Sequence, residues 1–145
     1  MRFDYDECIK KGLLRKTPSS KDRAERSIER AKRWLQESEK NMEAGAYNSA
    51  VLSSYLAMFH SARAMLFKDG YREKSHACVA RYLEELYVKK KLLDEKWVEL
   101  LDHYRELRHS DQYNLSFFTT EEEAKKALES AKGFVEIMEH LLKMF

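Results

Sequence analysis

The sequence predicts an all-α protein, an antiparallel bundle of four to five helices connected in up-down order. Charged residues make up 36% of the 145 residues and proline occurs once, a composition that favours long solvated helices over strands and turns. Apolar residues recur at alternating steps of three and four along the chain. The links between these periodic segments are short, so neighbouring helices must run antiparallel. No segment has the alternating pattern of a β-strand, and we expect none.

The chain divides into two parts at its single proline. Residues 4–16 form a short amphipathic piece that Gly12 interrupts, and Pro18 follows it. We therefore assign residues 1–19 to an N-terminal short helix and linker, and residues 20–145 to the helical bundle. A chain of this length suits one domain with a core of its own.

Capping signals set the bounds of the helices in the bundle. Serine or threonine precedes three of them, glycine follows two of them, and Thr120 with Glu123 forms a capping box. The expected helices cover about residues 20–44, 46–69, 75–90, 94–110 and 120 to the C-terminus.

The helix at about 46–69 is apolar on nearly every side, so it must be covered over most of its circumference. We expect it at the centre of the bundle. One small bundle seldom covers so much apolar surface alone, and we therefore also expect a homodimer. The same stretch contains Ser53, His60 and Arg63, so it predicts a buried helix, and we expect no membrane span.

The two cysteines, Cys8 and Cys78, are too few for a disulfide framework and form no C-x-x-C pair. We interpret both as reduced thiols of a cytoplasmic protein. The start of the chain lacks the apolar region of a signal peptide, which agrees with this interpretation.

Basic residues are concentrated near the N-terminus, although the formal net charge is only +2. Ten lysines and arginines lie between Lys10 and Arg33, against three acidic residues. Either this segment contacts phosphate, or it is a solvated helix face with ion pairs along it.

A charged residue interrupts the apolar stripe of the helix at about 94–110. The stripe from Trp97 to Tyr104 continues at the same spacing into Arg108 and Asp111. A buried guanidinium is costly unless it is paired. Either Arg108 and Asp111 form an ion pair where the helix leaves the bundle, or Arg108 binds phosphate, which suits its planar fork.

Two histidines are further candidates. His60 lies in the most apolar helix, where it is either a core residue with one hydrogen bond or a site residue. His76 follows the expected cap Ser75, and capping or packing accounts for it. The histidines and cysteines show no metal-ligand spacing, and the P-loop, dinucleotide and nucleophile-elbow motifs are absent. We therefore expect no metal and no cofactor.

Three stretches of the chain carry a family resemblance: Gly45 to Ala64, Ser75-His76, and Arg105 to Tyr113. Together they resemble the HEPN superfamily, in particular its small prokaryotic subfamily that is often encoded beside minimal nucleotidyltransferases. The likeness covers about residues 20–143. It implies a helical bundle, homodimerisation and a site at the dimer cleft. It also implies a nucleotidyltransferase as partner protein, in a toxin–antitoxin-type system.

Active HEPN ribonucleases carry an arginine and a histidine separated by four to six residues, and two protomers together form a site that needs no metal. This chain departs from that motif. After four intervening residues, Arg108 is followed by Tyr113 where the histidine should stand, and His109 follows Arg105 after only three. The departure argues against ribonuclease activity.

Two hypotheses follow, with a purely structural helical dimer as a third. In the first, a HEPN dimer binds nucleotide or RNA phosphate through residues at its cleft: Arg105, Arg108, His60, Tyr55 and Tyr113. In the second, the protein is a metal-independent ribonuclease that uses Arg108, or alternatively Arg105, together with His109 as catalytic residues. Since Arg105, Arg108 and His109 lie within one helical turn, we expect their side chains in one neighbourhood.

Overall fold

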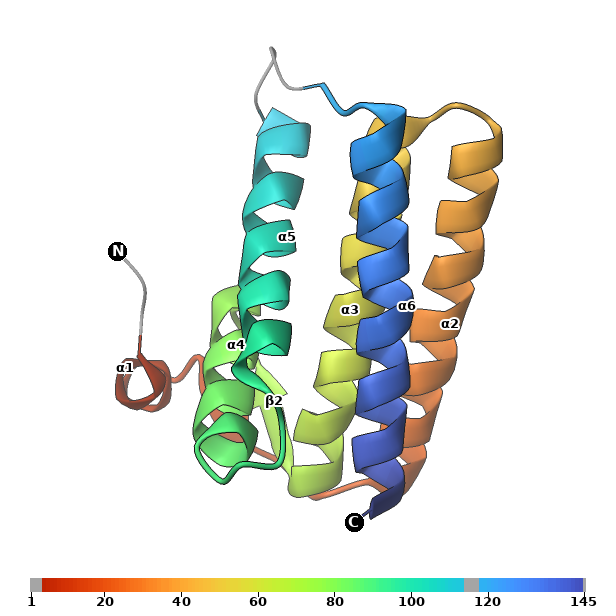
Figure 1. The fold of residues 1–145 in the computed structure, drawn as a ribbon. Helices are drawn as coiled ribbons and strands as arrows, with labels where there is room; N and C mark the ends of the chain where they lie inside the picture. The colour runs from red at the N-terminus through yellow and green to blue at the C-terminus, as the bar shows by residue number, and fades with distance from the viewer. Residues whose placement is uncertain (1–3, 114–117, 145) are drawn as a thin grey trace.

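The predicted all-α class is confirmed by the computed structural model, which describes residues 4–113 and 118–144 and, of these, all side chains but those of residues 110–113. Figure 1 shows the four longest helices standing alongside one another and the short N-terminal helix at one side. The helices are α1 (Tyr5–Lys10), α2 (Lys21–Glu43), α3 (Tyr47–Asp69), α4 (His76–Leu83), the π-helical segment η1 (Glu84–Val88), α5 (Glu95–Tyr113) and α6 (Glu121–Met144).

The capping signals act largely as expected. The hydroxyl of Ser20 accepts from the backbone N–H of Arg23 at 3.0 Å and so caps α2. At the start of α6, the hydroxyl of Thr120 accepts from the N–H of Glu123, whose carboxylate in turn accepts from the N–H of Thr120. Gly70 ends α3 with a φ of 85°, in the left-handed region that favours glycine.

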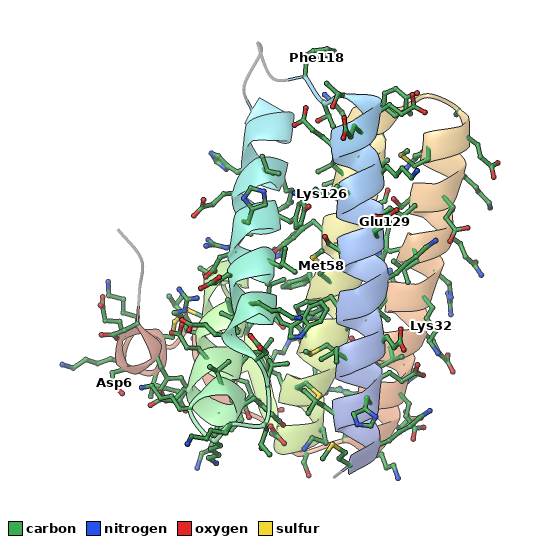
Figure 2. The ribbon with its side chains drawn as sticks, viewed as in Figure 1. Asp6, Lys32, Met58, Phe118, Lys126 and Glu129 are labelled. Atoms are coloured by element: carbon green, nitrogen blue, oxygen red, sulfur yellow. A yellow bond between two sulfur atoms is a disulfide. The ribbon has the colours of Figure 1, made fainter. Side chains whose placement is uncertain are left out.

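The core is built around α3, which packs against α2, α4, α5 and α6 and is buried on almost every side. Figure 2 shows Met58 inside the bundle, with Lys32 at its surface. One polar group of the core, the buried hydroxyl of Ser38, is satisfied, since it donates to Ala50 O and lies 2.9 Å from the hydroxyl of Ser54. One chain therefore covers this apolar helix by itself, and the apolarity of α3 no longer supports a dimer.

Two short strands contradict the expectation that no β-structure would form. β1 (Leu14–Lys16) pairs antiparallel with β2 (Tyr71–Glu73), with Leu14 opposite Glu73. Three residues are too few for an alternating pattern to be recognised in a sequence. The strand pair ties the segment before α2 to the turn after α3.

The expected helix at 75–90 is also corrected, because regular α-helix stops at Leu83 and continues as the π-helical segment η1. The hydroxyls of Tyr82 and Tyr87 both donate to the same carboxylate oxygen of Asp69, at 2.7 and 2.6 Å. A π-helical turn brings residues five positions apart closer to one face than an α-helix does. The shared contact with Asp69 thus accounts for the change of helix type.

The interpretation of both cysteines as reduced thiols is wrong. Cys8 in α1 and Cys78 in α4 form a disulfide, with their Cα atoms 5.9 Å apart. Seventy positions separate them in the chain, and only the packing of α1 against α4 brings them together. Disulfides are rare in cytosolic proteins, so the cysteines no longer support a cytoplasmic location, which stays a prediction.

None of the helices in the described ranges combines the length and the apolar character that crossing a membrane requires.

Candidate functional site

A histidine held by two aromatic residues of α3 forms the centre of the candidate site. Tyr55 and Phe59 lie one turn apart on α3 and project from the same face. The ring of Phe59 stacks on the imidazole of His76, with 3.8 Å between the ring centroids. The hydroxyl of Tyr55 lies 2.9 Å from Nδ1 of His76. These contacts fix the plane of the imidazole.

The hydrogen bond also sets the tautomer of His76. Burial raises the pKa of Tyr55, so the phenol keeps its proton, and it has no other acceptor among the described residues. A phenol that donates to Nδ1 leaves the neutral imidazole with its proton on Nε2. His76 can therefore donate from Nε2 to a ligand.

Arg108 of α5 adds a positive charge that is largely withdrawn from water. Its guanidinium lies 5.8 Å from the centroid of the Tyr55 ring, a cation–π contact. Its Nε is buried and has no hydrogen-bond partner among the described residues. A buried cationic donor without a partner is costly, and an anion would satisfy it.

Arg105 is positioned by a chain of ion pairs. Its guanidinium lies 3.1 Å from one carboxylate oxygen of Asp102, and the other oxygen lies 2.5 Å from the guanidinium of Arg81. Arg81 is only 1% exposed and has Glu84 as a second partner at 3.5 Å. The buried arginine anchors Asp102, and Asp102 in turn orients Arg105.

These side chains surround a cleft of about 490 Å³, which we call the α4–α5 cleft. Ser75, His76 and Ala77 line it from the start of α4, and Arg105, Arg108 and His109 line it from α5, together with Glu106. The first turn of α4 also contributes backbone N–H groups that lack partners within the helix.

The electrostatic potential inside the α4–α5 cleft is positive. Burial, and then the charges of Arg108, Arg63 and Arg105, lower the pKa of His76 to about 4. His76 is therefore neutral at neutral pH and becomes charged more readily once an anion neutralises the arginines.

The structure brings together four of the predicted site residues. Arg105, Arg108 and His109 line one cleft as expected, and Tyr55 contacts it through Arg108 and His76. His60 does not join them, because it lines a different cleft, between α2 and α3.

Two further predictions concern Asp111, as the ion-pair partner of Arg108, and Tyr113, as a residue of the site. The side chains of Asp111 and Tyr113 lie outside the described residues. The predicted pair of Arg108 with Asp111 and the contribution of Tyr113 to the site stay predictions.

Sequence reasoning missed His76 as a site residue and assigned it to capping. Ser75 stands at the N-cap position of α4, yet its side chain makes no capping hydrogen bond. The sequence does contain a signal for this site: Tyr55 and Phe59 are four positions apart on one helix, and His76 directly follows an expected N-cap. The role of the buried Arg81 could not be predicted from the sequence, because its neighbours along the chain do not indicate that Asp102 of another helix contacts it.

No group of three or more His, Cys, Asp or Glu side chains in the described part of the chain is arranged to hold a metal ion. The cleft instead presents guanidinium and imidazole donors, which suit an oxyanion.

Three known proteins are similar in sequence to this chain. A "UPF0332 protein" of Archaeoglobus fulgidus is 30% identical over 115 residues, which is 79% of this chain and 91% of the relative. "Putative toxin MJ0605" of Methanocaldococcus jannaschii is 31% identical over 97 residues, 67% of this chain and 72% of the relative. "Putative toxin MJ0142" of the same organism is 26% identical over 111 residues, 77% of this chain and 76% of the relative.

The family model of the HEPN domain matches residues 24–141, a range that runs from the first turn of α2 almost to the end of α6 and includes the residues of the α4–α5 cleft. The chain therefore belongs to the HEPN domain family.

Proposed function

We propose that this protein binds the phosphate of a nucleotide or RNA in the α4–α5 cleft. The observation that carries the proposal is the arrangement of Arg108 beside His76. The Nε of Arg108 is buried and has no hydrogen-bond partner among the described residues, and the imidazole is held by Tyr55 and Phe59. With Tyr55 donating to Nδ1, the neutral imidazole has its proton on Nε2 and can donate from there. A phosphate oxygen accepts from both groups and compensates the charge.

The proposal includes the assembly that the family resemblance implies. A homodimer would place two such clefts near each other and double the positive charge available to a polyanion. A nucleotidyltransferase is the proposed partner protein, in a toxin–antitoxin-type system, and the toxin names of two relatives support that setting. Light scattering at micromolar concentration should give twice the 17.3 kDa chain mass, and 17.3 kDa would contradict the dimer.

A second candidate function is metal-independent cleavage of RNA. Arg105, Arg108 and His109, the residues of this hypothesis, line one cleft, and His76 adds a neutral imidazole beside them. An imidazole next to guanidinium groups can transfer a proton while the arginines stabilise a developing phosphorane charge. The absent arginine–histidine motif still favours binding over cleavage.

Substitutions in the α4–α5 cleft distinguish the binding function from the cleavage function. Arg108→Gln should weaken the binding of labelled RNA and of nucleotides about tenfold or more, since it removes a charge-assisted phosphate contact. Arg33→Gln provides a matched control, because Arg33 is an exposed arginine of α2 that lines neither cleft. Under the binding hypothesis, His109→Gln changes affinity little.

Under the cleavage hypothesis, wild-type protein degrades total RNA in the presence of EDTA, and both Arg108→Gln and His109→Gln abolish the cleavage. If wild-type protein neither binds nor cuts RNA or nucleotides, both candidates fail and the third hypothesis, a structural helical dimer, remains.

A further inference from the structure

A second cleft, of about 290 Å³, lies between α2, α3 and β2. We call it the arginine cleft because five arginines from these three elements line it, together with the imidazole of His60. The arginines are Arg23, Arg26 and Arg30 of α2, Arg63 of α3 and Arg72 of β2. None of the described residues that line it is acidic.

The protein itself neutralises only part of this charge. Arg63 pairs with Glu73 at 2.6 Å, and Arg26 pairs with Asp22 at 3.0 Å on the open surface. Among the side chains that the structure describes, none forms an ion pair with the other three arginines, which are Arg23, Arg30 and Arg72.

The arrangement has an electrostatic cost that the described ion pairs offset only in part. Arg23, Arg26 and Arg30 are spaced three and four positions apart, so they repel one another along one face of α2. The charge also reaches into the cleft, since Arg63 and Arg30 add to burial in lowering the pKa of His60 to about 4. A bound anion would relieve both effects.

The arginine cleft adjoins the α4–α5 cleft across a single aromatic ring. The centroid of Phe59 lies 5.4 Å from that of His60, which lines the arginine cleft. It lies 3.8 Å from that of His76, which lines the α4–α5 cleft. A ligand with several linked phosphates can reach both clefts, whereas a mononucleotide has its phosphates at one end only.

We propose that the arginine cleft is a second phosphate-binding subsite, and that the ligand is a single RNA strand whose neighbouring phosphates occupy the two clefts. This inference rests on the proposed function of the α4–α5 cleft. It adds that the ligand is an oligonucleotide, whereas the α4–α5 cleft alone could bind either a nucleotide or RNA. Arginine forks suit phosphate oxygens, and a strand follows a positively charged groove through its backbone.

The test compares variants of the two clefts by fluorescence anisotropy, using a labelled single-stranded RNA of about a dozen nucleotides, a length within the usual site sizes, and a labelled mononucleotide. Arg30→Gln combined with Arg72→Gln removes two unpaired charges of the arginine cleft, Arg108→Gln removes one from the α4–α5 cleft, and Arg33→Gln is the control. The double variant should bind the RNA about tenfold or more weakly than the wild type does, and its affinity for the mononucleotide should stay unchanged. The salt dependence of its RNA affinity should fall by about 0.7 in logarithmic slope per lost contact.

Each contrary outcome has a distinct meaning. If the double variant matches the Arg33→Gln control while Arg108→Gln weakens RNA, the arginine cleft is not a subsite and the proposed function stands. If only the double variant loses RNA, the arginine cleft binds RNA but the function proposed for the α4–α5 cleft is wrong. If polyglutamate displaces RNA as well as unlabelled RNA does, the cleft takes any polyanion and the assignment to RNA fails.

Discussion

At the scale of single residues, His76 connects the stability of the fold to the chemistry of the cleft. Its imidazole is stacked on Phe59 and bonded to Tyr55, and it lies in the field of Arg108 and Arg105. The same contacts that hold the ring in place make its charged form unfavourable. A phosphate ligand would reverse that preference, because it would compensate the arginines.

We expect stability to fall as the pH is lowered from about 6.5 to 4, in part because of His76. Its folded-state pKa, about 4, lies below the value of 6.5 for an unperturbed histidine. In this window the unfolded chain binds more protons, so the free energy of unfolding decreases with decreasing pH and levels off above it. His60, with a pKa also lowered to about 4, contributes in the same direction.

Urea unfolding at several pH values measures this effect. His76→Gln keeps a polar side chain but removes the titration, so its unfolding free energy should depend less on pH in this window than that of the wild type. His140→Gln, at an exposed position of α6, controls for the loss of a histidine. Identical pH dependence in wild type and His76→Gln would show that the folded state does not penalise the charged ring.

Arg81 is the residue on which the ion-pair chain depends. Asp102→Ala would leave this guanidinium, 1% exposed, with only Glu84 at 3.5 Å. We expect a loss of about 3–5 kcal/mol in the free energy of unfolding, the range for breaking a buried pair from one side.

The exposed pair of Arg26 and Asp22 provides the control for this prediction. Their side chains are 67% and 75% exposed, so Asp22→Ala should cost less than about 1 kcal/mol. Chemical denaturation of both variants gives the comparison. Equal losses would mean that water reaches Arg81 in solution.

At the scale of elements, the two glycines that follow α2 and α3 allow two costs of adding a side chain to be compared, the cost of the backbone conformation and the cost of a steric clash. Gly45 and Gly70 have φ values of 73° and 85°, which L side chains rarely adopt. A Cβ at Gly45 meets nothing within 4 Å, whereas one at Gly70 would lie 2.8 Å from the carbonyl oxygen of Thr17. Thr17 in turn donates its N–H to Gly70 O at 2.9 Å.

We therefore expect Gly45→Ala to cost about 1 kcal/mol, the conformational part alone. Gly70→Ala should cost at least about 1 kcal/mol more, because the linker must move and its hydrogen bond weakens. Urea midpoints of the two variants check the difference. A Gly70→Ala variant as stable as Gly45→Ala would show that the linker at Thr17 adjusts freely.

At the scale of the whole molecule, the disulfide between Cys8 and Cys78 holds α1 against α4. It closes a loop with a sequence separation of 70, and its removal should cost about 4 kcal/mol through the added freedom of the unfolded chain. Melting with and without reductant measures the loss. Cys8→Ala combined with Cys78→Ala should melt at one temperature under both conditions, and two titratable thiols in unreduced wild-type protein would contradict the bond.

The arrangement of helices also places two positively charged clefts beside α3. The α4–α5 cleft lies where α4 and α5 pack against α3, and the arginine cleft lies between α3, α2 and β2; Figure 1 shows α4 and α5 on one side of α3 and α2 on another. Positive side chains are therefore concentrated around the central helix, and both proposals rest on this concentration.

Local patterns in the sequence are sufficient to predict the helices and the order in which they follow one another. Periodicity and caps act within a few residues, so the bounds of α2, α3 and α6 were predicted closely. The sequence also identified Arg105, Arg108 and His109 as one group, because residues on one helical turn must be neighbours.

The contacts between distant groups become visible in the folded chain alone. The disulfide, the strand pair, the contact of Tyr55 with His76 and the ion pair of Arg81 with Asp102 all join different elements. No local pattern encodes such contacts, because they depend on how helices pack and on which faces are left uncovered. For the same reason His60, predicted beside Arg108, lines the arginine cleft, since α3 directs Tyr55 and Phe59 toward α4 and His60 toward α2.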